Sequence, residues 1–216
     1  MGYRVDELVP GEIYHICTRG VEQRDIFIDD ADYERFVALL VHCLPCKDVP
    51  SFSIGQRLRY EVSLTDAGEG LVDLMCYCLM SNHIHLLIRE NVERGTSMFM
   101  QRVLTGYARY FNIRMSRSGS LFLHPFKAVL VDGDDQLLHV SRYIHLNPFV
   151  AQMVKRADEY PWSSLAEYTG SKKRRCHTDV IGSMMSSKDY KQFVNDEADY
   201  KKSLAAYEYS LVDNDV

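Results

Sequence analysis

The sequence predicts an α+β protein built on a ferredoxin-like sheet, the split βαβ arrangement, with a helical tail appended. Two observations lead to this class. Apolar residues alternate in short segments and recur at helical spacing in longer ones, and the segments follow the order strand, helix, strand, strand, helix, strand. A chain of 216 residues, 46% of them apolar, can bury a core without disulfides. We therefore expect one domain over residues 1–165 and a helical tail over 166–216.

Each element follows from a local pattern. The alternating segment EIYHICTR is typical of a strand, and Gly20 ends it. Asp29 or Asp30 can cap the helix that follows, and Pro148 limits the last helix of the domain. The predicted strands cover residues 12–19, 57–64, 71–80, 83–89 and 126–131, and the predicted helices cover residues 31–42, 96–115 and 134–146.

The charge is distributed unevenly along the chain. Between Arg94 and Val131 there are six basic residues and no acidic one, which gives this segment a charge of +6. The rest of the chain then carries −11, from 19 basic and 30 acidic residues. A basic segment in an acidic protein indicates a localised anionic partner, and chance clustering on a solvated surface is the alternative.

Composition also excludes several classes of protein. No apolar run approaches the roughly 20 residues of a membrane span, and the N-terminus has no signal-peptide pattern. We expect a cytoplasmic protein with reduced cysteines and no membrane partner. The close pairs Cys43/Cys46 and Cys76/Cys78 allow a zinc site, although buried thiols in a helix end and a core strand are the favoured interpretation.

Two short patterns carry chemistry. On a strand, His83 and His85 project to the same face, where two imidazoles can share a divalent metal or can be hydrogen-bonded and inert. Tyr143 and Asn147 lie four residues apart and therefore share one face of a helix. The tyrosine is either a nucleophile beside a metal ligand or an aromatic ring packed between helix and sheet. These patterns alone leave both alternatives open.

Together the patterns resemble a known family. The stretches YHICTRG, LMSNHIHLLI, GSLFLHPFKAVLVD, LLHVSRYIHLNPFVA and YPWSSLAEY are similar in order and spacing to the single-tyrosine HUH transposases, and most similar to their REP-associated tyrosine transposase-like branch. The resemblance covers about residues 11–168 and implies the HUH endonuclease fold. It also implies that His83, His85 and Asn147 bind Mg²⁺ or Mn²⁺ and that Tyr143 is the nucleophile.

By this resemblance the protein is expected to be a metal-dependent single-stranded DNA endonuclease and strand-transferase. It would act on hairpin-bearing DNA through a 5′-phosphotyrosine. The REP-associated relatives are expected to be monomers and some other relatives exchange helices in dimers, so a monomer is favoured and the oligomeric state stays open. Two alternatives stay open. One is a domesticated DNA-binding protein without cleavage, because the composition is acidic and Pro125 and Val150 stand where relatives often carry basic residues. The other is a hydrolytic metalloenzyme that uses the histidine pair to activate water. The predicted DNA contacts are the basic side chains Arg19, Arg102, Arg109, Arg114, Arg117 and Lys127.

Overall fold

In a computed structural model of the protein, the described residues are 8–47, 50, 52, 64, 66, 68–123, 125–170 and 175–196. The predicted strand over 57–64 falls outside these ranges except for Leu64, and so does the end of the predicted tail, 197–216.

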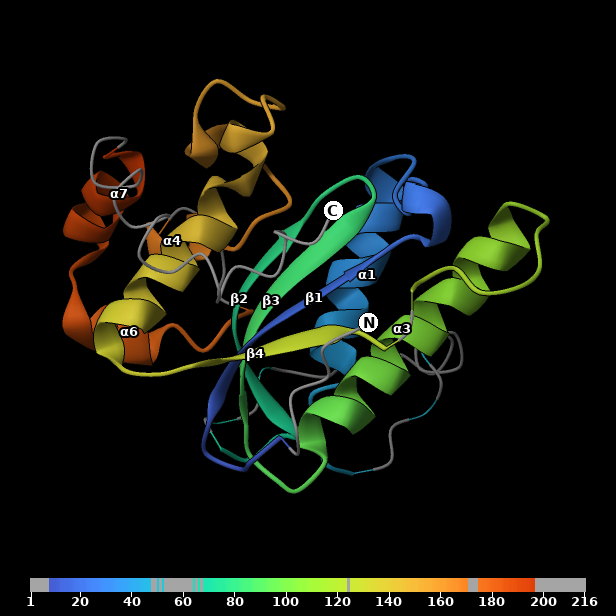
Figure 1. Ribbon diagram of the computed structural model, residues 1–216, viewed down its shortest axis with the longest axis horizontal. Coiled ribbons are helices and arrows are strands. Elements are labelled where there is room, and N and C mark those ends of the chain that lie inside the picture. Colours follow the sequence, from blue (N-terminus) through green and yellow to red (C-terminus); the bar gives the residue numbers. More distant parts are fainter. Residues whose placement is uncertain are drawn as a thin grey trace.

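Helices lie on both sides of a single sheet (Figure 1). None of the described helices is long and apolar enough to cross a membrane. In chain order the elements are β1 (Ile13–Arg19), η1 (Val21–Gln23), α1 (Asp30–His42), β2 (Val72–Leu79), β3 (His83–Glu90), α3 (Gly95–Arg114), β4 (Lys127–Val131), α4 (Asp134–Val150), η2 (Ala157–Glu159), α5 (Leu165–Tyr168), α6 (Asp179–Met184) and α7 (Ser187–Asn195).

The sheet has the strand order β2-β3-β1-β4, and every neighbouring pair is antiparallel. This is the split βαβ arrangement, so the predicted fold class is confirmed. β3 and β1 are the inner strands, and their register pairs Arg19 with His83 and Cys17 with His85. The strand that carries both histidines therefore lies in the middle of the sheet.

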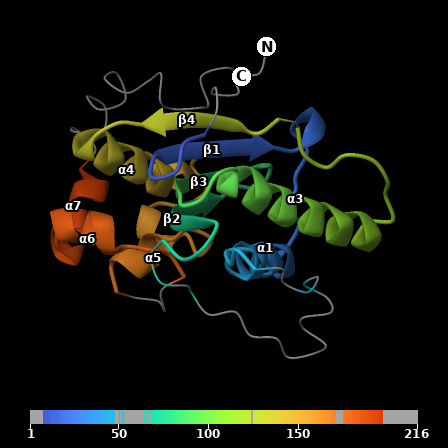
Figure 2. The ribbon, with the colours of Figure 1, turned by 90° about the horizontal axis from the view of Figure 1, so that it is seen from below.

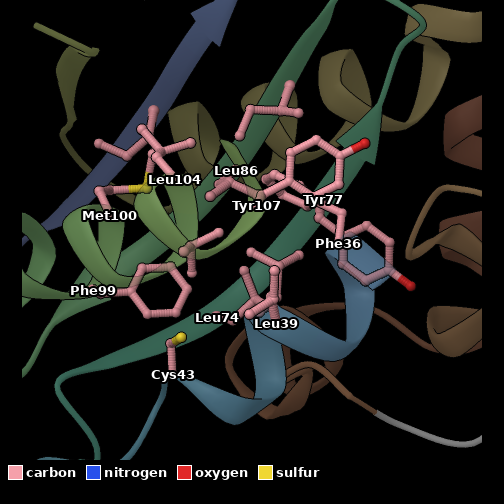
Figure 3. Close-up of a cluster of buried hydrophobic side chains, with 14 of the residues drawn as sticks. Phe36, Leu39, Cys43, Leu74, Tyr77, Leu86, Phe99, Met100, Leu104 and Tyr107 are labelled. Carbon is pink, nitrogen blue, oxygen red and sulfur yellow. The ribbon is translucent and has the colours of Figure 1, made fainter. Parts of the chain in front are cut away.

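Helices α1 and α3 cover one face of the sheet, which we call the α1/α3 face (Figure 3). Leu86 of β3 and Phe36 of α1 belong to the apolar cluster buried there. Helix α1 begins with an N-cap, because the Asp29 carboxylate accepts a hydrogen bond from the backbone N–H of Asp32. Arg114 of α3 makes ion pairs with both aspartates, so charge also joins the two helices.

Helix α4 covers the opposite face, which we call the α4 face, together with the short helices α5, α6 and α7 (Figures 1 and 2). A second cluster of buried residues lies there and includes Cys76 of β2, Ile144 of α4 and Tyr190 of α7. The described helices of the predicted tail thus pack on the same face as α4.

Helix α4 continues further than the sequence predicted, because it includes Pro148 and ends at Val150. A proline lacks the N–H that would bond the carbonyl four residues earlier, here that of Ile144. This costs little in the last turn, where the backbone N–H of Ala151 already closes the helix on the carbonyl of Asn147. Asn147 therefore lies inside the final turn and not at the helix end.

Candidate active site

The two histidines of β3 lie on the α4 face, as the alternation of side chains along a strand requires. His85 is completely buried and His83 is half-buried. Their rings are nearly perpendicular, with centroids 4.9 Å apart. The structure therefore brings the two predicted metal ligands side by side.

Each of these imidazoles is held through its Nδ1 atom. The Nδ1 of His83 lies 2.6 Å from the side-chain oxygen of Asn82, which can only accept a hydrogen bond, so this nitrogen carries the proton. The Nδ1 of His85 lies 3.0 Å from Nε2 of His15. A metal-binding histidine commonly uses one ring nitrogen for a supporting hydrogen bond and the other for the metal. Nε2 is thus the atom through which each ring would bind a metal.

Tyr143 lies on α4, with its ring beside those of His85 and His15. Its ring centroid is 5.7 Å from that of His85 and 5.8 Å from that of His15, in edge-to-face arrangements. The side chain of Tyr143 is 8% exposed. The structure therefore brings the predicted nucleophile close to the histidine pair of β3. In the sequence, Tyr143 comes some 60 residues after these histidines.

Asn147 lies one turn after Tyr143 and is half-buried. Its side-chain nitrogen donates to the backbone carbonyl of Tyr143 over 3.3 Å. This bond uses the nitrogen and leaves the role of ligand to the amide oxygen, which is the hard donor that Mg²⁺ and Mn²⁺ prefer.

Two of the predicted DNA-binding residues lie at the edge of this site. Strand alternation places Arg19 of β1 on the same face as His15, and the register sets it beside His83. Lys127 of β4 pairs with Cys17, the residue of β1 that also pairs with His85. Both cations are therefore within the neighbourhood of the histidine pair.

The other four predicted DNA-binding residues belong to α3 and the loop after it, on the α1/α3 face. Arg114 is engaged by Asp29 and Asp32, and Arg102 donates to the carbonyl of Pro45 over 2.8 Å. Arg117 donates to the side-chain oxygen of Asn112, in the last turn of α3, and to the backbone carbonyl of Ser120. Arg109 is exposed and lines a pocket of about 810 Å³ between α1 and α3.

Two buried side chains tie α4 to its surroundings. The Arg142 guanidinium lies 4.6 Å from the ring centroid of Phe193 on α7. The ring nitrogens of His145 lie 2.8 Å from the hydroxyls of Tyr190 and Ser164. Burial lowers the pKa of His145 to about 3, so its imidazole is neutral in the folded protein. These contacts fix the helix that carries the predicted nucleophile.

The chemistry of the donor set fits a divalent metal. Among the residues that the structure describes, no three His, Cys, Asp or Glu side chains are grouped to hold a metal ion. The predicted set differs from such a group because its third member is an amide. Two imidazoles, each with its Nδ1 in a hydrogen bond, and an amide oxygen are suitable donors.

The cysteine pairs do not converge on one site. Cys43 belongs to the cluster on the α1/α3 face, whereas Cys76 and Cys78 belong to the cluster on the α4 face. Burial raises the pKa of Cys43 and of Cys76 to about 12, which keeps both thiols protonated. These buried thiols behave as small apolar residues.

His15 is a residue of this site that the sequence did not identify. The alternation of β1 places it on the same face as Arg19, which is a signal visible in the sequence. Its position beside His85 depends on the pairing of β1 with β3, and nothing local in the sequence reveals that pairing.

Part of the chain matches a known protein family. Residues 59–147, which include His83, His85, Tyr143 and Asn147, match a family model described as "Transposase IS200 like". No curated protein is a significant match. Among solved structures, the chain is similar to a REP-associated tyrosine transposase bound to a REP hairpin, with a TM-score of 0.55 and 11% identity over 82% of this chain and 96% of that one.

A second solved structure, the tRNA(His) guanylyltransferase from Saccharomyces cerevisiae, gives a TM-score of 0.40 and 6% identity over 96% of this chain and 81% of that one. That likeness is too low to support an argument. The likeness to the REP-associated transposase concerns the fold, and the family model concerns the sequence of β2 to α4. Over residues 59–147 the chain is therefore similar in sequence to the IS200-like transposases, and over most of its length it is similar in fold to a REP-associated tyrosine transposase.

Proposed function

We propose that the protein is a metal-dependent endonuclease and strand-transferase for single-stranded DNA, with Tyr143 as its nucleophile. The observation that carries the proposal is that the rings of Tyr143, His85 and His15 lie close together on the α4 face. The Tyr143 ring lies within 5.8 Å of the ring centroids of both His85 and His15. A phosphate bound at His83 and His85 would therefore lie within reach of the Tyr143 phenol.

The reaction follows from this placement. The phenol oxygen of Tyr143 attacks phosphorus in line and loses its proton, and the bond from phosphorus to the 3′ oxygen breaks. The leaving 3′ oxygen takes up a proton, and the 5′ phosphate stays on the tyrosine. Attack by a free 3′-hydroxyl reverses the step and joins two strands, so no nucleotide cofactor is consumed.

The other residues of the site have supporting roles in this proposal. His83, His85 and Asn147 would hold the metal, which when bound supplies charge neutralisation at the scissile phosphate. Arg19 and Lys127 border the site and would bind phosphates on either side of the cut. The similar REP-associated transposase is bound to a REP hairpin. We therefore propose a hairpin-bearing single strand as the substrate.

The experiment uses one hairpin oligonucleotide labelled at either end, incubated with Mn²⁺ and analysed on denaturing gels. The 3′-labelled fragment should become covalently attached to protein, whereas the 5′-labelled fragment should be released with a free 3′-hydroxyl. Tyr143→Phe should abolish the adduct. Tyr14→Phe is the matched control, because Tyr14 is buried on the other face of the sheet and its hydroxyl accepts a hydrogen bond from the backbone N–H of Val9.

The same gels distinguish the alternatives. Binding of the hairpin without any adduct would indicate a DNA-binding protein that does not cleave. Cleavage that persists in Tyr143→Phe would indicate that water and not the phenol attacks the phosphate. Either result would contradict the proposed role of Tyr143.

A further inference from the structure

We propose that His15 is a positioning residue of this site, which accepts a hydrogen bond from Nδ1 of His85 and so holds that ring with Nε2 directed to the metal. The inference rests on the proposed function, because it assumes that His85 is a metal ligand. It adds a residue from β1 to a site whose ligands come from β3 and α4.

The first support is geometric. His15 and His85 are both completely buried, and Nε2 of His15 lies 3.0 Å from Nδ1 of His85. The two ring planes lie within 25° of each other with centroids 5.3 Å apart, which suits a hydrogen bond in the plane of both rings. A contact of this length between two ring nitrogens needs one proton between them, so one ring donates and the other accepts.

The second support is the direction of that bond. A metal needs a lone pair, so a His85 that binds through Nε2 must carry its proton on Nδ1. Nε2 of His15 must then accept, and the proton of the His15 ring must be on its own Nδ1. His83 has the same arrangement, because its Nδ1 donates to the side-chain oxygen of Asn82. In this arrangement both predicted histidine ligands donate a hydrogen bond from Nδ1 to a neighbouring acceptor.

The third support is that His15 also touches the nucleophile. Its ring meets the edge of the Tyr143 ring at a centroid distance of 5.8 Å. One imidazole from β1 therefore packs against both a predicted ligand and the predicted nucleophile. A neutral acceptor suits this position, since a carboxylate would bring an additional buried charge to the site.

The test measures Mn²⁺ affinity of the full chain by calorimetry, without DNA. His15→Leu removes the acceptor, and we expect affinity to fall roughly 10- to 100-fold, as for other residues that support metal ligands. His15→Gln offers a side-chain oxygen near the position of Nε2 and should restore most of this loss. His42→Leu is the matched control, because His42 is a buried histidine that bonds the carbonyl of Pro50 and belongs to α1.

A second readout is independent of metal. Nitrogen NMR of the metal-free protein at pH 8, where imidazoles are neutral, should show the proton of His85 on Nδ1. In His15→Leu this preference should be lost, and in His15→Gln it should be kept. A general loss of stability would not change the tautomer of one ring in this selective way.

Three results would overturn the inference. Mn²⁺ affinity and the His85 tautomer unchanged in His15→Leu would show that His15 does not position the ring. Affinity as low in His15→Gln as in His15→Leu would indicate that His15 is itself a ligand. A proton on Nε2 of His85 in the wild type would reverse the hydrogen bond. If the wild type binds no Mn²⁺ at all, the proposed function fails, and the tautomer still decides whether His15 sets the state of His85.

Discussion

On the α1/α3 face the sheet presents Ile84 and Leu86 of β3 to an apolar core, whereas on the α4 face the same strand presents His83 and His85. The first face is closed by apolar and aromatic side chains from two long helices. The second is closed by α4 with a further apolar cluster, which also holds hydroxyls and imidazoles within hydrogen-bonding distance of one another, such as those of Tyr190 and His145. One strand thus serves two different environments.

This difference between the two faces indicates that neighbouring residues of β3 have different roles. Successive side chains of a strand point to opposite faces, so odd and even positions of the strand face different partners. Substitutions on the α1/α3 face should change stability, and substitutions at the histidines should change chemistry. Adjacent residues on one strand can test this separation.

Among variants of β3, the largest effect is expected from His83→Ala. This variant removes a predicted metal ligand that is only half-buried, so stability should change by less than about 1 kcal/mol. A metal typically contributes several kcal/mol to the transition state, so adduct formation in Mn²⁺ should slow about 10³-fold. Single-turnover gels measure the rate. A variant that forms adduct at the wild-type rate would remove His83 from the site.

The next effect is expected from Ile84→Ala, one residue further along β3. Ile84 is completely buried in the cluster on the α1/α3 face, and such truncations cost about 2–5 kcal/mol in the free energy of unfolding. Urea unfolding measures this loss. At a temperature where the variant is still folded, adduct formation should stay close to that of the wild type. Comparable losses of activity in both variants would show that the two faces are not separable.

The α4 face should also respond to pH. Burial lowers the pKa of His145 to about 3 in the folded protein, whereas an unfolded histidine titrates near pH 6.5. As pH falls below about 6.5, the unfolded chain takes up a proton that the folded protein does not, so stability is lost. Between pH 7 and pH 5 the loss from this group is about 2 kcal/mol.

The measurement is urea unfolding at both pH values in EDTA, with His145→Gln for comparison. The amide can still bond the Tyr190 hydroxyl but does not titrate, so the pH-dependent loss should be smaller in this variant. Equal losses in the variant and the wild type would assign the acid sensitivity to other groups.

The sequence was sufficient to predict those features of the site that depend on local geometry. Alternation along a strand places His83 and His85 on one face, and helical spacing places Tyr143 and Asn147 on one face. Which strands pair is a matter of tertiary packing. His15 lies 70 residues before His85, so their contact could not be predicted from spacing.

The charges of α3 show the same limit. Six basic residues between Arg94 and Val131 are visible in the sequence, but the partners of each are not. Arg114 meets Asp29 and Asp32 only because α1 and α3 pack side by side on the same face. A charge count therefore predicts a basic segment without showing which of its charges can reach DNA.

The smallest effect concerns these arginines. Arg109 is exposed beside the pocket between α1 and α3, where the lining residues that the structure describes include Arg35 and Arg102 and no acidic side chain. If single-stranded DNA contacts this part of the α1/α3 face, Arg109→Ala should weaken binding a few-fold and reduce the slope of log K against log salt by about 0.7. Fluorescence anisotropy between low and moderate salt measures both values.

Arg114→Ala is the matched comparison, because the Arg114 guanidinium is engaged by two aspartates. This variant should lower the melting temperature and leave the salt slope unchanged. An unchanged slope in both variants would confine the DNA to the α4 face, with Arg19 and Lys127 as its cationic contacts.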